Sequence, residues 1–588
     1  MAVARLSLTS FSDGEVRLSD EVELYQRTYT TLLRSSGETH LRVLESSHRA
    51  MGSSLHPLAA SEELDLGAFI YSIRRLPDGI VGAELIVMGQ DVEDLIAGGV
   101  PVESWEEAEA PARRRRWYDS GTGTLAVLMA SASDVDDLVP TLVAFQIEWN
   151  KIRVRLRAVG LPREDRVPGE VLAGELGGSA ADWDRLRDAW GERFGERMRL
   201  IEDQRLSLRV RMLGGTNTGY SRLTRRWWAP VSAELGPEGT VTERPLYFVS
   251  SNTHSLVNIV TGIAREREAE LVAFVEQMDN SEILRRELKA FREGRAEGSW
   301  ENFLYFVARL YFSARGPGGA AERRAAEQAK GVTHLRSKTA LRVPAQVMQL
   351  AGLDVSDLDP RLGDVDSSAL AASDAVIVNI DYPLGIAAYN ILREITVDRT
   401  ALRGVYVLGK AATLNADVGD VMISSVVHDE HSGSTYWLDN AFVVDDLAMD
   451  LRFGTGLDNQ RAVTVKSTFL QNRSYLDFYY REAFTVVEME AGPFCNAIYE
   501  IADADRYPVG EAVNFSKLPI DLGIIHYASD TPYTQARTLG AQGLNYYGMD
   551  STYASSLAIV RRILRLEGAL AEDEGPRPRS GAKRSSVR

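Results

Sequence analysis

Cysteine and long apolar runs are almost absent from this chain. Its 588 residues include one cysteine, Cys495, which excludes an internal disulfide framework and fits a reducing compartment. No stretch approaches about 18 uninterrupted apolar residues, so no membrane-spanning helix is expected. Residues 1–9 lack a charged segment followed by an apolar one, so no secretory signal is expected either. These absences predict a cytoplasmic protein without a membrane partner.

Positive charge is also scarce. The chain has 66 Lys and Arg against 83 Asp and Glu, a net charge of −17, which argues against nucleic acid as a partner. The run Arg113 to Arg116 is a local exception that follows an acidic stretch at 103–109. It could contact an anionic ligand or another subunit, but a solvated loop with local salt bridges is the favoured interpretation.

The length predicts more than one domain, because single cores stop growing near about 250–300 residues. We expect an accessory α/β domain over 1–235, with a linker at the Gly-Pro-Glu-Gly turn 236–239. A second domain is expected over 240–567. The tail 569–588, rich in Pro, Gly, Ser and basic residues, is expected to be disordered.

Hydrophobic spacing gives a coarse prediction of the first domain. Residues 21–60 have apolar side chains at helical spacing, and 135–156 are predicted as a further helix. The segments 67–75, 83–89 and 124–130 are predicted as short strands.

The most informative motif is the run Val487-Glu488-Met489-Glu490-Ala491-Gly492. Apolar residues precede it and a helix is predicted after it, which puts the acids at the carboxyl end of a strand, where open α/β sheets bind ligands. A carboxylate there can accept hydrogen bonds from two adjacent hydroxyls, as in a ribose. The alternative is a solvated acidic pair at a strand end.

Other motifs surround it in a particular order. A strand at 404–409 ends in Gly409-Lys410-Ala411-Ala412, a Gly-Asp-Val strand follows at 419–421, and an apolar strand ends in Ser529-Asp530. This order resembles the purine nucleoside phosphorylase and nucleosidase superfamily over roughly residues 375–566, with hexameric phosphorylases and AMP nucleosidases nearest in layout. The resemblance implies an α/β fold, a nucleoside-phosphorylase-like mixed sheet flanked by helices.

The resemblance also implies roles for the residues that match its motifs. Asp530 would be the general acid that protonates a purine at N7, for which it needs a raised pKa, and Ser529 would orient it. Glu490 would hold the ribose 2′ and 3′ hydroxyls with Met489 packed on the sugar. Glu488 would support Glu490 or face away.

Phe469 falls where the superfamily places its base-stacking residue. Aromatic rings serve this role well, which makes Phe469 the candidate for stacking on a purine. The alternative is a Phe that packs in the core.

Ser251, Asn252 and His254 follow the predicted strand 245–250 and precede a helix, and free N–H groups at a helix start form an anion site. In the superfamily the corresponding loop helps to bind phosphate, although the usual Gly-Asp-Pro is absent here. An ordinary capped turn is the alternative.

Gly409 and Lys410 complete the predicted anion site. A glycine suits a position where a ligand lies against the backbone. Hexameric phosphorylases have an Arg two residues before this glycine and a Ser after it, both on phosphate, whereas this chain has Val407 and Lys410. The missing Arg disfavours phosphorolysis. Lys410 could restore the missing charge or bind a phosphate carried by the substrate, and the alternative is an ordinary lysine at a strand end.

Residues 265–345 interrupt the expected sheet as a charged helical insertion. Within it His334, Arg336, Lys338 and Arg342 gather positive charge. Hexameric phosphorylases borrow an Arg from a neighbouring subunit, and Arg336 is a weak counterpart.

The run His428-Asp429-Glu430-His431 is interpreted as a polar hairpin end and not as a metal site, because no helix brings three or four ligands together there. No metal or other cofactor is therefore expected. The predicted function is hydrolysis of the N-glycosidic bond of a purine nucleoside or nucleotide. The alternatives are a phosphorylase with inorganic phosphate as a second partner, and a non-catalytic nucleoside or nucleotide sensor or scaffold. The resemblance implies a homo-oligomer.

Overall fold

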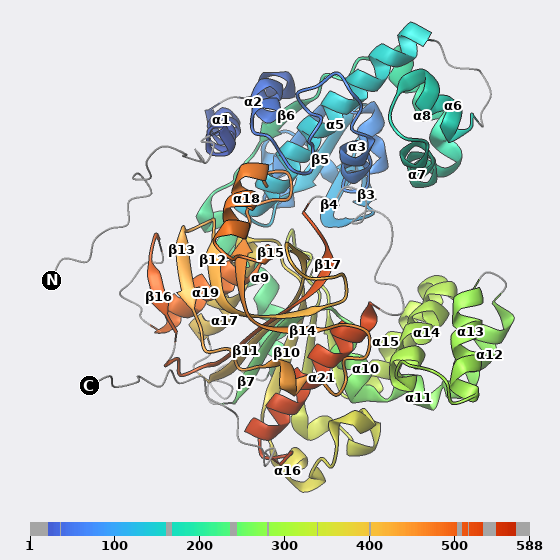
Figure 1. Ribbon diagram of the computed structural model, residues 1–588. Coiled ribbons are helices and arrows are strands. Elements are labelled where there is room, and N and C mark those ends of the chain that lie inside the picture. Colours follow the sequence, from blue (N-terminus) through green and yellow to red (C-terminus); the bar gives the residue numbers. More distant parts are fainter. Residues whose placement is uncertain are drawn as a thin grey trace, which may run out of the picture.

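The computed structural model has two β-sheets, each with its own helices (Figure 1). The structure describes residues 21–35, 37–159, 167–235, 244–278, 281–337, 339–398, 401–502, 509–515, 517–532 and 548–571. The linker expected at 236–239, the tail from 572 onward and Lys338 lie outside these ranges. No helix within the described ranges is long and apolar enough to cross a membrane.

The first sheet has six strands in the order β1-β6-β2-β5-β4-β3. Their bounds are β1 Thr39–His40, β2 Leu85–Gly89, β3 Glu106–Ala110, β4 Arg113–Asp119, β5 Thr124–Leu128 and β6 Arg209–Met212. The accompanying helices are α1 Glu21–Ser35, α2 Glu45–Ala50, α3 Leu66–Ile73, α4 Val92–Ala97, α5 Ala132–Val159, α6 Gly169–Leu176, α7 Ala180–Trp190 and α8 Phe194–Asp203. The strands predicted at 83–89 and 124–130 and the helix predicted at 135–156 are confirmed.

Two predictions in this region are wrong. Helix α3, Leu66–Ile73, replaces the strand predicted at 67–75, because the Asp65 carboxylate caps its first turn by accepting the N–H of Ala68 at 3.1 Å. A short apolar run fits either element, and the cap decides between them. The helix predicted over 21–60 is broken into α1 and α2, and no helix covers 51–60.

The second sheet is larger and mixed. Its order is β16-β13-β12-β14-β15-β11-β7-β10-β9-β8, with β17 paired to both β11 and β12. The bounds are β7 Leu246–Ser251, β8 Val332–Leu335, β9 Ala345–Gln349, β10 Val376–Asp381, β11 Leu402–Thr413, β12 Val421–Asp429, β13 Ser434–Trp437, β14 Gly456–Thr464, β15 Val486–Glu488, β16 Ala512–Asn514 and β17 Asp521–Asp530. The pairs β12–β14, β14–β15, β15–β11, β11–β17 and β17–β12 join five strands in a closed ring.

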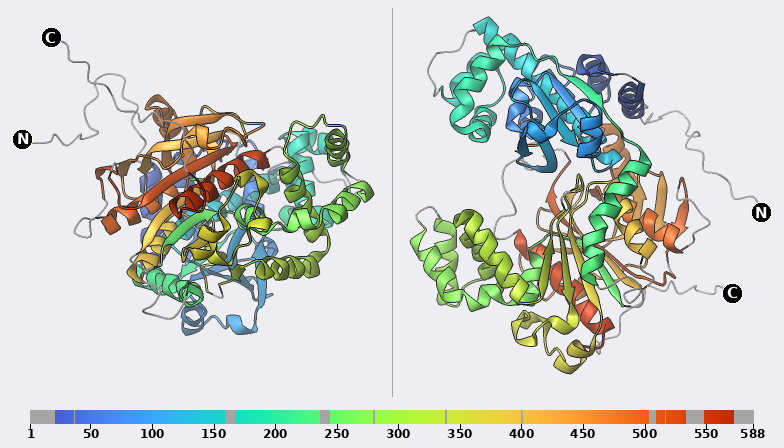
Figure 2. Two further views of the ribbon diagram at one scale, coloured as in Figure 1. Left: turned by 90° about the horizontal axis from the view of Figure 1, so that it is seen from below. Right: turned by 180° about the vertical axis from the view of Figure 1, so that it is seen from behind.

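Helices cover both faces of the second sheet (Figure 2). On β7, Phe248 packs on one face with α9 Asn217–Leu235, α17 Ile386–Asp398 and α19 Ala491–Ala502. Its neighbours Tyr247 and Val249 pack on the opposite face with α10 Ser255–Thr261 and α21 Met549–Leu566. This alternation is the period of two expected for a strand buried on both sides. Two shorter helices are α16 Ser367–Ala372, whose Leu370 packs in the same core as α10 and α21, and α18 Arg473–Arg481, whose Leu476 packs with Val463 and Val487.

The insertion predicted at 265–345 is mostly helical. It contains α11 Ile263–Glu266, α12 Glu268–Gln277, α13 Glu282–Arg292, α14 Trp300–Ala314 and α15 Gly316–Ala329. It also contains β8, which pairs antiparallel with β9 at the edge of the second sheet, so the insertion is not purely helical. The Gly-Pro-Gly-Gly sequence at 316–319 separates α14 from α15 and forms the first turn of α15.

Candidate active site

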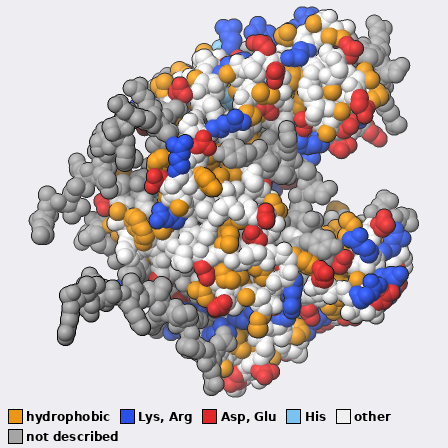
Figure 3. Space-filling model, in the orientation of Figure 1, with side chains coloured by type: hydrophobic (Ala, Val, Ile, Leu, Met, Phe, Trp, Pro, Cys, Tyr) orange, Lys and Arg blue, Asp and Glu red, His pale blue; other side chains and the backbone are white. Residues whose placement is uncertain are grey.

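A cavity of about 1000 Å³ lies where the first sheet, the insertion and the second sheet meet. Figure 3 shows the molecule hollowed between the lobe that carries α6–α8 and the helices of the insertion. We call the first sheet together with its helices α1–α8 the first lobe. This lobe contributes Tyr71, Arg75 and Arg113 to the lining of the cavity. The second sheet contributes Lys410, Met489 and Glu490 among others. Such a volume lies at the upper end of the roughly 300–1,000 Å³ typical of ligand sites.

The pairing of β11 explains why distant motifs meet here. β17 runs parallel to β11 and ends with Asp530 opposite Ala412, while β15 runs antiparallel and places Val487 opposite the same residue. The carboxyl ends of β15 and β17 therefore both reach the stretch of β11 that carries Lys410. The prediction that the acids lie at the carboxyl end of a strand is confirmed, because β15 ends at Glu488.

Glu488 is 3% exposed, and its hydrogen bonds hold the motif in shape. Its Oε2 accepts the backbone N–H groups of Glu490 at 2.6 Å and Ala491 at 2.7 Å, at the start of α19. The hydroxyl of Thr464 donates to its Oε1. Glu488 thus supports the turn that carries Glu490, which is the first of the two alternatives expected for it.

Glu490 lines the cavity, and the pKa of its side chain is raised. Burial, and then the nearby carboxylate of Glu488, raise the pKa of Glu490 to about 8. The positive charges of Arg113 and Lys410 oppose this rise. At neutral pH the side chain is therefore largely a carboxylic acid, which can both donate and accept a hydrogen bond.

Lys410 faces the same space. Burial lowers the pKa of its ammonium, the acidic side chains of Asp530 and Glu490 act in the opposite direction when ionised, and Arg113 and Arg75 lower it further. These mutual effects show that cations from the first lobe lie close to acids from the second sheet. The cavity is therefore completed by both halves of the chain.

Ser529 and Asp530 also line the cavity. Asp530 is 2% exposed. The Ser529 hydroxyl donates to the carbonyl oxygen of Ala411 at 3.2 Å and so ties the end of β17 to β11. This bond fixes the backbone that carries Asp530, while the expected contact of Ser529 with the Asp530 carboxylate stays a prediction.

Three residues of the predicted anion site have structural partners and do not line the cavity. Ser251 is fully buried and donates to Asn379 at 2.7 Å. Asn252 accepts the N–H groups of His254 and Ser255 at 2.9 and 2.7 Å, so it already caps the start of α10. A Cβ on Gly409 would lie 3.2 Å from the His526 ring, so this glycine accommodates the histidine, and its expected place against a ligand stays a prediction.

His254 is the member of that loop that does face the cavity. Burial and the neighbouring guanidinium groups of Arg323 and Arg309 lower the pKa of His254 to about 3. The imidazole is therefore neutral, and its Nδ1 lies 3.4 Å from the Tyr553 hydroxyl.

The structure does not place Phe469 in the cavity, which corrects the base-stacking prediction. Phe469 is 1% exposed and packs with Leu55, Ala68 and Ala144 of the first lobe. Its ring centroid lies 5.3 Å from that of Tyr71, edge to face. The segment after β14 serves as packing between the two halves of the chain, a role that a single sequence does not distinguish from base stacking.

Arg75 and Arg113 are site residues that the sequence did not single out individually. The Arg113 guanidinium forms two hydrogen bonds to Asp137 at 2.9 and 3.0 Å, and Arg75 lies over the Tyr71 ring at 3.3 Å. Burial lowers the pKa of Arg75 to about 10. The run Arg113 to Arg116 was the available signal, and it forms the start of strand β4 instead of a solvated loop.

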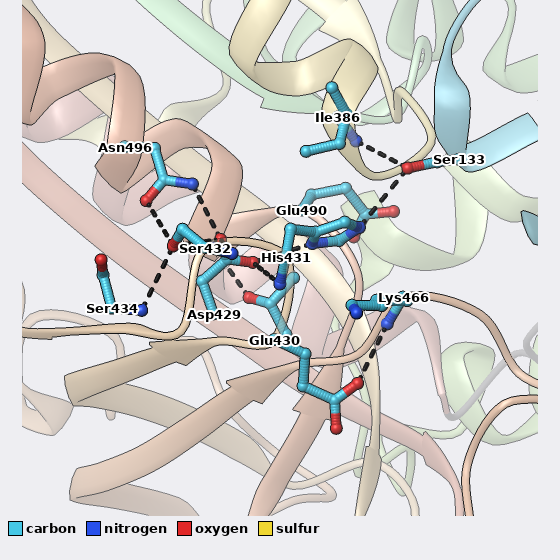
Figure 4. A network of polar contacts seen from close by, with 12 residues as sticks. Ser133, Ile386, Asp429, Glu430, His431, Ser432, Ser434, Lys466, Glu490 and Asn496 are labelled. Carbon is cyan, nitrogen blue, oxygen red and sulfur yellow. Dashed lines mark hydrogen bonds and ion pairs between the residues drawn. The ribbon is translucent and has the colours of Figure 1, made fainter. Parts of the chain in front are cut away.

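The hairpin end at 428–431 forms an interdomain network (Figure 4). Nδ1 of His431 lies 2.8 Å from Asp429, and its Nε2 lies 3.4 Å from the Ser133 hydroxyl of α5. Ser133 accepts the N–H of Ile386 at 2.9 Å. The order Asp–His–Ser is that of a hydrolase triad, but Ser133 is fully buried and does not line the cavity. The network therefore joins α5 to the second sheet.

Comparisons with solved structures give low overall similarity. A 5′-methylthioadenosine/S-adenosylhomocysteine nucleosidase from Colwellia psychrerythraea, in complex with adenine, is 15% identical over 41% of this chain and 88% of its own, with a TM-score of 0.27. The corresponding nucleosidase from Neisseria meningitidis is 16% identical over 42% and 94%, with a TM-score of 0.26. A methylthioadenosine phosphorylase from an antarctic soil metagenomic library is 8% identical over 33% and 72%, with a TM-score of 0.24. These scores fix neither fold nor function.

No curated protein matches the sequence. A family model described as "Family of unknown function (DUF6909)" matches residues 41–565, which is most of the chain. The chain therefore belongs to DUF6909.

Proposed function

We propose that this protein cleaves the N-glycosidic bond of a purine nucleoside or nucleotide by hydrolysis. The observation that carries the proposal is the meeting of three residues far apart in the sequence in one cavity: Lys410 on β11, Asp530 at the end of β17 and Glu490 just after β15. Cleavage builds positive charge on the ribose and negative charge on the leaving base. A site for it needs a group on the sugar hydroxyls and a proton donor for the base.

Asp530 is the proposed proton donor to N7 of the purine. Asp530 is 2% exposed and lines the cavity, and a proton donor must lie within hydrogen-bond reach of the atom that it protonates. Water supplies the hydroxyl that bonds to the anomeric carbon as the bond to the base nitrogen breaks, and the proton that this water releases returns Asp530 to its acid form. The products are the free base, which carries the donated proton, and the free sugar.

Glu490 is the proposed ligand of the ribose 2′ and 3′ hydroxyls, with Met489 against the sugar. The backbone N–H groups of Glu490 and Ala491 donate to the Glu488 carboxylate, which holds Glu490 in place before substrate arrives. As positive charge develops on the ribose, release of the Glu490 proton to solvent would leave a carboxylate that stabilises the transition state more than the ground state, which is what catalysis requires.

Phosphorolysis is the second candidate, and one observation favours it. The superfamily's phosphate-binding Arg is replaced by the buried Val407, yet Lys410 and Arg113 both act electrostatically on Glu490. These two cations could hold an inorganic phosphate near the sugar. A non-catalytic nucleoside sensor is the third candidate, and it would keep the pocket without turnover.

One experiment separates the three. The purified protein is incubated with purine nucleosides and nucleotides, with and without inorganic phosphate, and products are separated by chromatography. Free base and free sugar without phosphate support hydrolysis; ribose 1-phosphate formed only with phosphate supports phosphorolysis; binding without product supports the sensor.

Asp530→Asn should lower turnover by about 10²–10⁴-fold if Asp530 is the general acid. The exposed Asp439→Asn serves as the matched control. Full turnover in Asp530→Asn would refute the assignment of the acid.

A further inference from the structure

One side of the cavity is built from arginines of the insertion. Arg309 lies on α14, Arg323 and Arg324 lie on α15, and Arg336 follows β8. All four line the cavity that also contains Glu490 and Asp530. We refer to Arg309, Arg323, Arg324 and Arg336 as the arginine wall. None of the four belongs to the machinery proposed above for the sugar and the base.

The arginine wall carries more positive charge than its surroundings neutralise. Within the described ranges, Glu327 is the carboxylate that forms an ion pair with it, at 2.6 Å from Arg323. Glu327 also lies 2.6 Å from Nε2 of His334, so its charge is shared. Four guanidinium groups and one carboxylate leave a net charge of +3 (4 − 1). Like charges held together in a partly enclosed cavity repel each other, and an anion relieves that repulsion.

His254 shows that this charge is felt inside the cavity. Besides burial, Arg323 and Arg309 lower the pKa of His254 to about 3. The neutral imidazole adds no further positive charge and can offer a hydrogen bond. His254 follows β7, which pairs parallel with β11, so His254 and Lys410 line the cavity from the same edge of the sheet.

We propose that the arginine wall binds the phosphate chain of a nucleoside 5′-polyphosphate, whose sugar and base occupy the part of the cavity with Glu490 and Asp530. This rests on the proposed function for the position of the sugar. Guanidinium groups bind phosphate oxygens through paired hydrogen bonds, which makes arginine the residue suited to such a chain.

The amount of charge selects a polyphosphate over a monophosphate. A single phosphate monoester carries about −1.5 to −2 at neutral pH, which leaves part of the wall unneutralised. Each further phosphate adds negative charge, so the charge of the ligand's phosphate chain comes closer to neutralising the net +3 of the arginine wall. The volume of about 1000 Å³ also leaves room for more than a nucleoside.

Equilibrium binding to the full-length protein tests this proposal. Titration calorimetry would compare adenosine with its 5′-mono-, di- and triphosphates, and guanosine with its own series. The Asp530→Asn variant allows the same measurement without turnover. Affinity should rise from nucleoside to triphosphate by at least ten-fold, and the gain should shrink as salt is added.

Arg309→Gln/Arg324→Gln should remove most of that gain and leave nucleoside affinity unchanged. Arg292→Gln on α13 is the matched control, because Arg292 is paired with Glu276 and does not line the cavity. Thermal unfolding of each variant checks that it is folded. Equal affinity for nucleoside and triphosphate, or equal loss for both in the double variant, would overturn the proposal.

The outcome separates this inference from the proposed function. Triphosphate binding that depends on the wall, with no base released from any compound, supports the wall and refutes the hydrolase. Nucleoside hydrolysis without tighter binding of polyphosphates supports the hydrolase and refutes the polyphosphate site. If inorganic phosphate binds the wall and cleavage then requires it, the wall is a site for the attacking phosphate and the polyphosphate proposal fails.

Discussion

The carboxylate of Glu488 accepts the backbone N–H of Glu490 at 2.6 Å, two residues along the same motif. One acid therefore shapes the turn, and the other is presented to the cavity. The proximity of the first carboxylate also disfavours charge on the second, which contributes to the raised pKa of Glu490. Glu488 therefore has a structural role and Glu490 a proposed binding role, and substitution of each should give a different result.

Glu490→Gln should reduce kcat/KM for the substrate by roughly 10-fold to 100-fold, because hydrogen bonds to a charged group contribute about 1.5–3 kcal/mol each. The amide retains the shape and one acceptor of the carboxyl group but cannot ionise. Steady-state kinetics on the folded variant measures the effect. Glu500→Gln on α19, the helix that follows Glu490, is the control, because Glu500 contacts Tyr389 and does not line the cavity. Unchanged kinetics in Glu490→Gln would remove Glu490 from the site.

Glu490 should also make stability depend on pH. Its pKa rises from 4.5 in the unfolded chain to about 8 in the folded protein, so the folded state holds this proton more tightly. The resulting stability is fully present below about pH 4.5 and is lost as the pH rises through 8. Between these values the wild type should therefore lose stability relative to Glu490→Gln. Urea unfolding of both proteins at pH 5, 6, 7 and 8 measures this difference, and a constant difference across the range would contradict it.

Glu488→Ala should lower the free energy of unfolding by about 1–3 kcal/mol, since it leaves two N–H groups and the Thr464 hydroxyl without their acceptor. Glu488→Gln, which keeps one acceptor oxygen, should cost less. Activity should fall in both, because the turn that carries Glu490 loosens. Denaturant unfolding with parallel kinetics measures the two effects. If Glu488→Ala unfolded like the wild type but lost activity, Glu488 would instead contact the substrate.

Much of the second sheet could be predicted from the sequence because its signals are local. The strand before Glu488, the strand before Asp530 and the helix that ends at Leu566 each have an apolar period and a clear boundary. Sequence motifs alone predicted Lys410 and Glu490 as site residues, and both line the cavity.

The rest depends on contacts between distant segments. The burial of Phe469 against Tyr71 requires the first lobe to dock on the loop after β14, and no periodicity in either segment encodes that docking. Arg75 and Arg113 enter the cavity for the same reason. The sequence identified Arg336 only as a weak counterpart of a borrowed arginine, and the fold of the insertion adds Arg309, Arg323 and Arg324 beside it.

The space around Gly409 gives the last prediction. A Cβ at this position would lie 3.2 Å from Cδ2 of His526, closer than ordinary van der Waals contact, and His526 is fully buried. Gly409→Ala should therefore lower the free energy of unfolding by about 1–3 kcal/mol through overpacking. In the His526→Ala background the same substitution should cost less, with a coupling energy of about 0.5–3 kcal/mol in a double-mutant cycle. Denaturant unfolding of the four proteins measures the cycle. If Gly409→Ala left stability unchanged and weakened nucleoside binding, the glycine would be needed by a ligand, as the sequence first suggested, and not by the histidine.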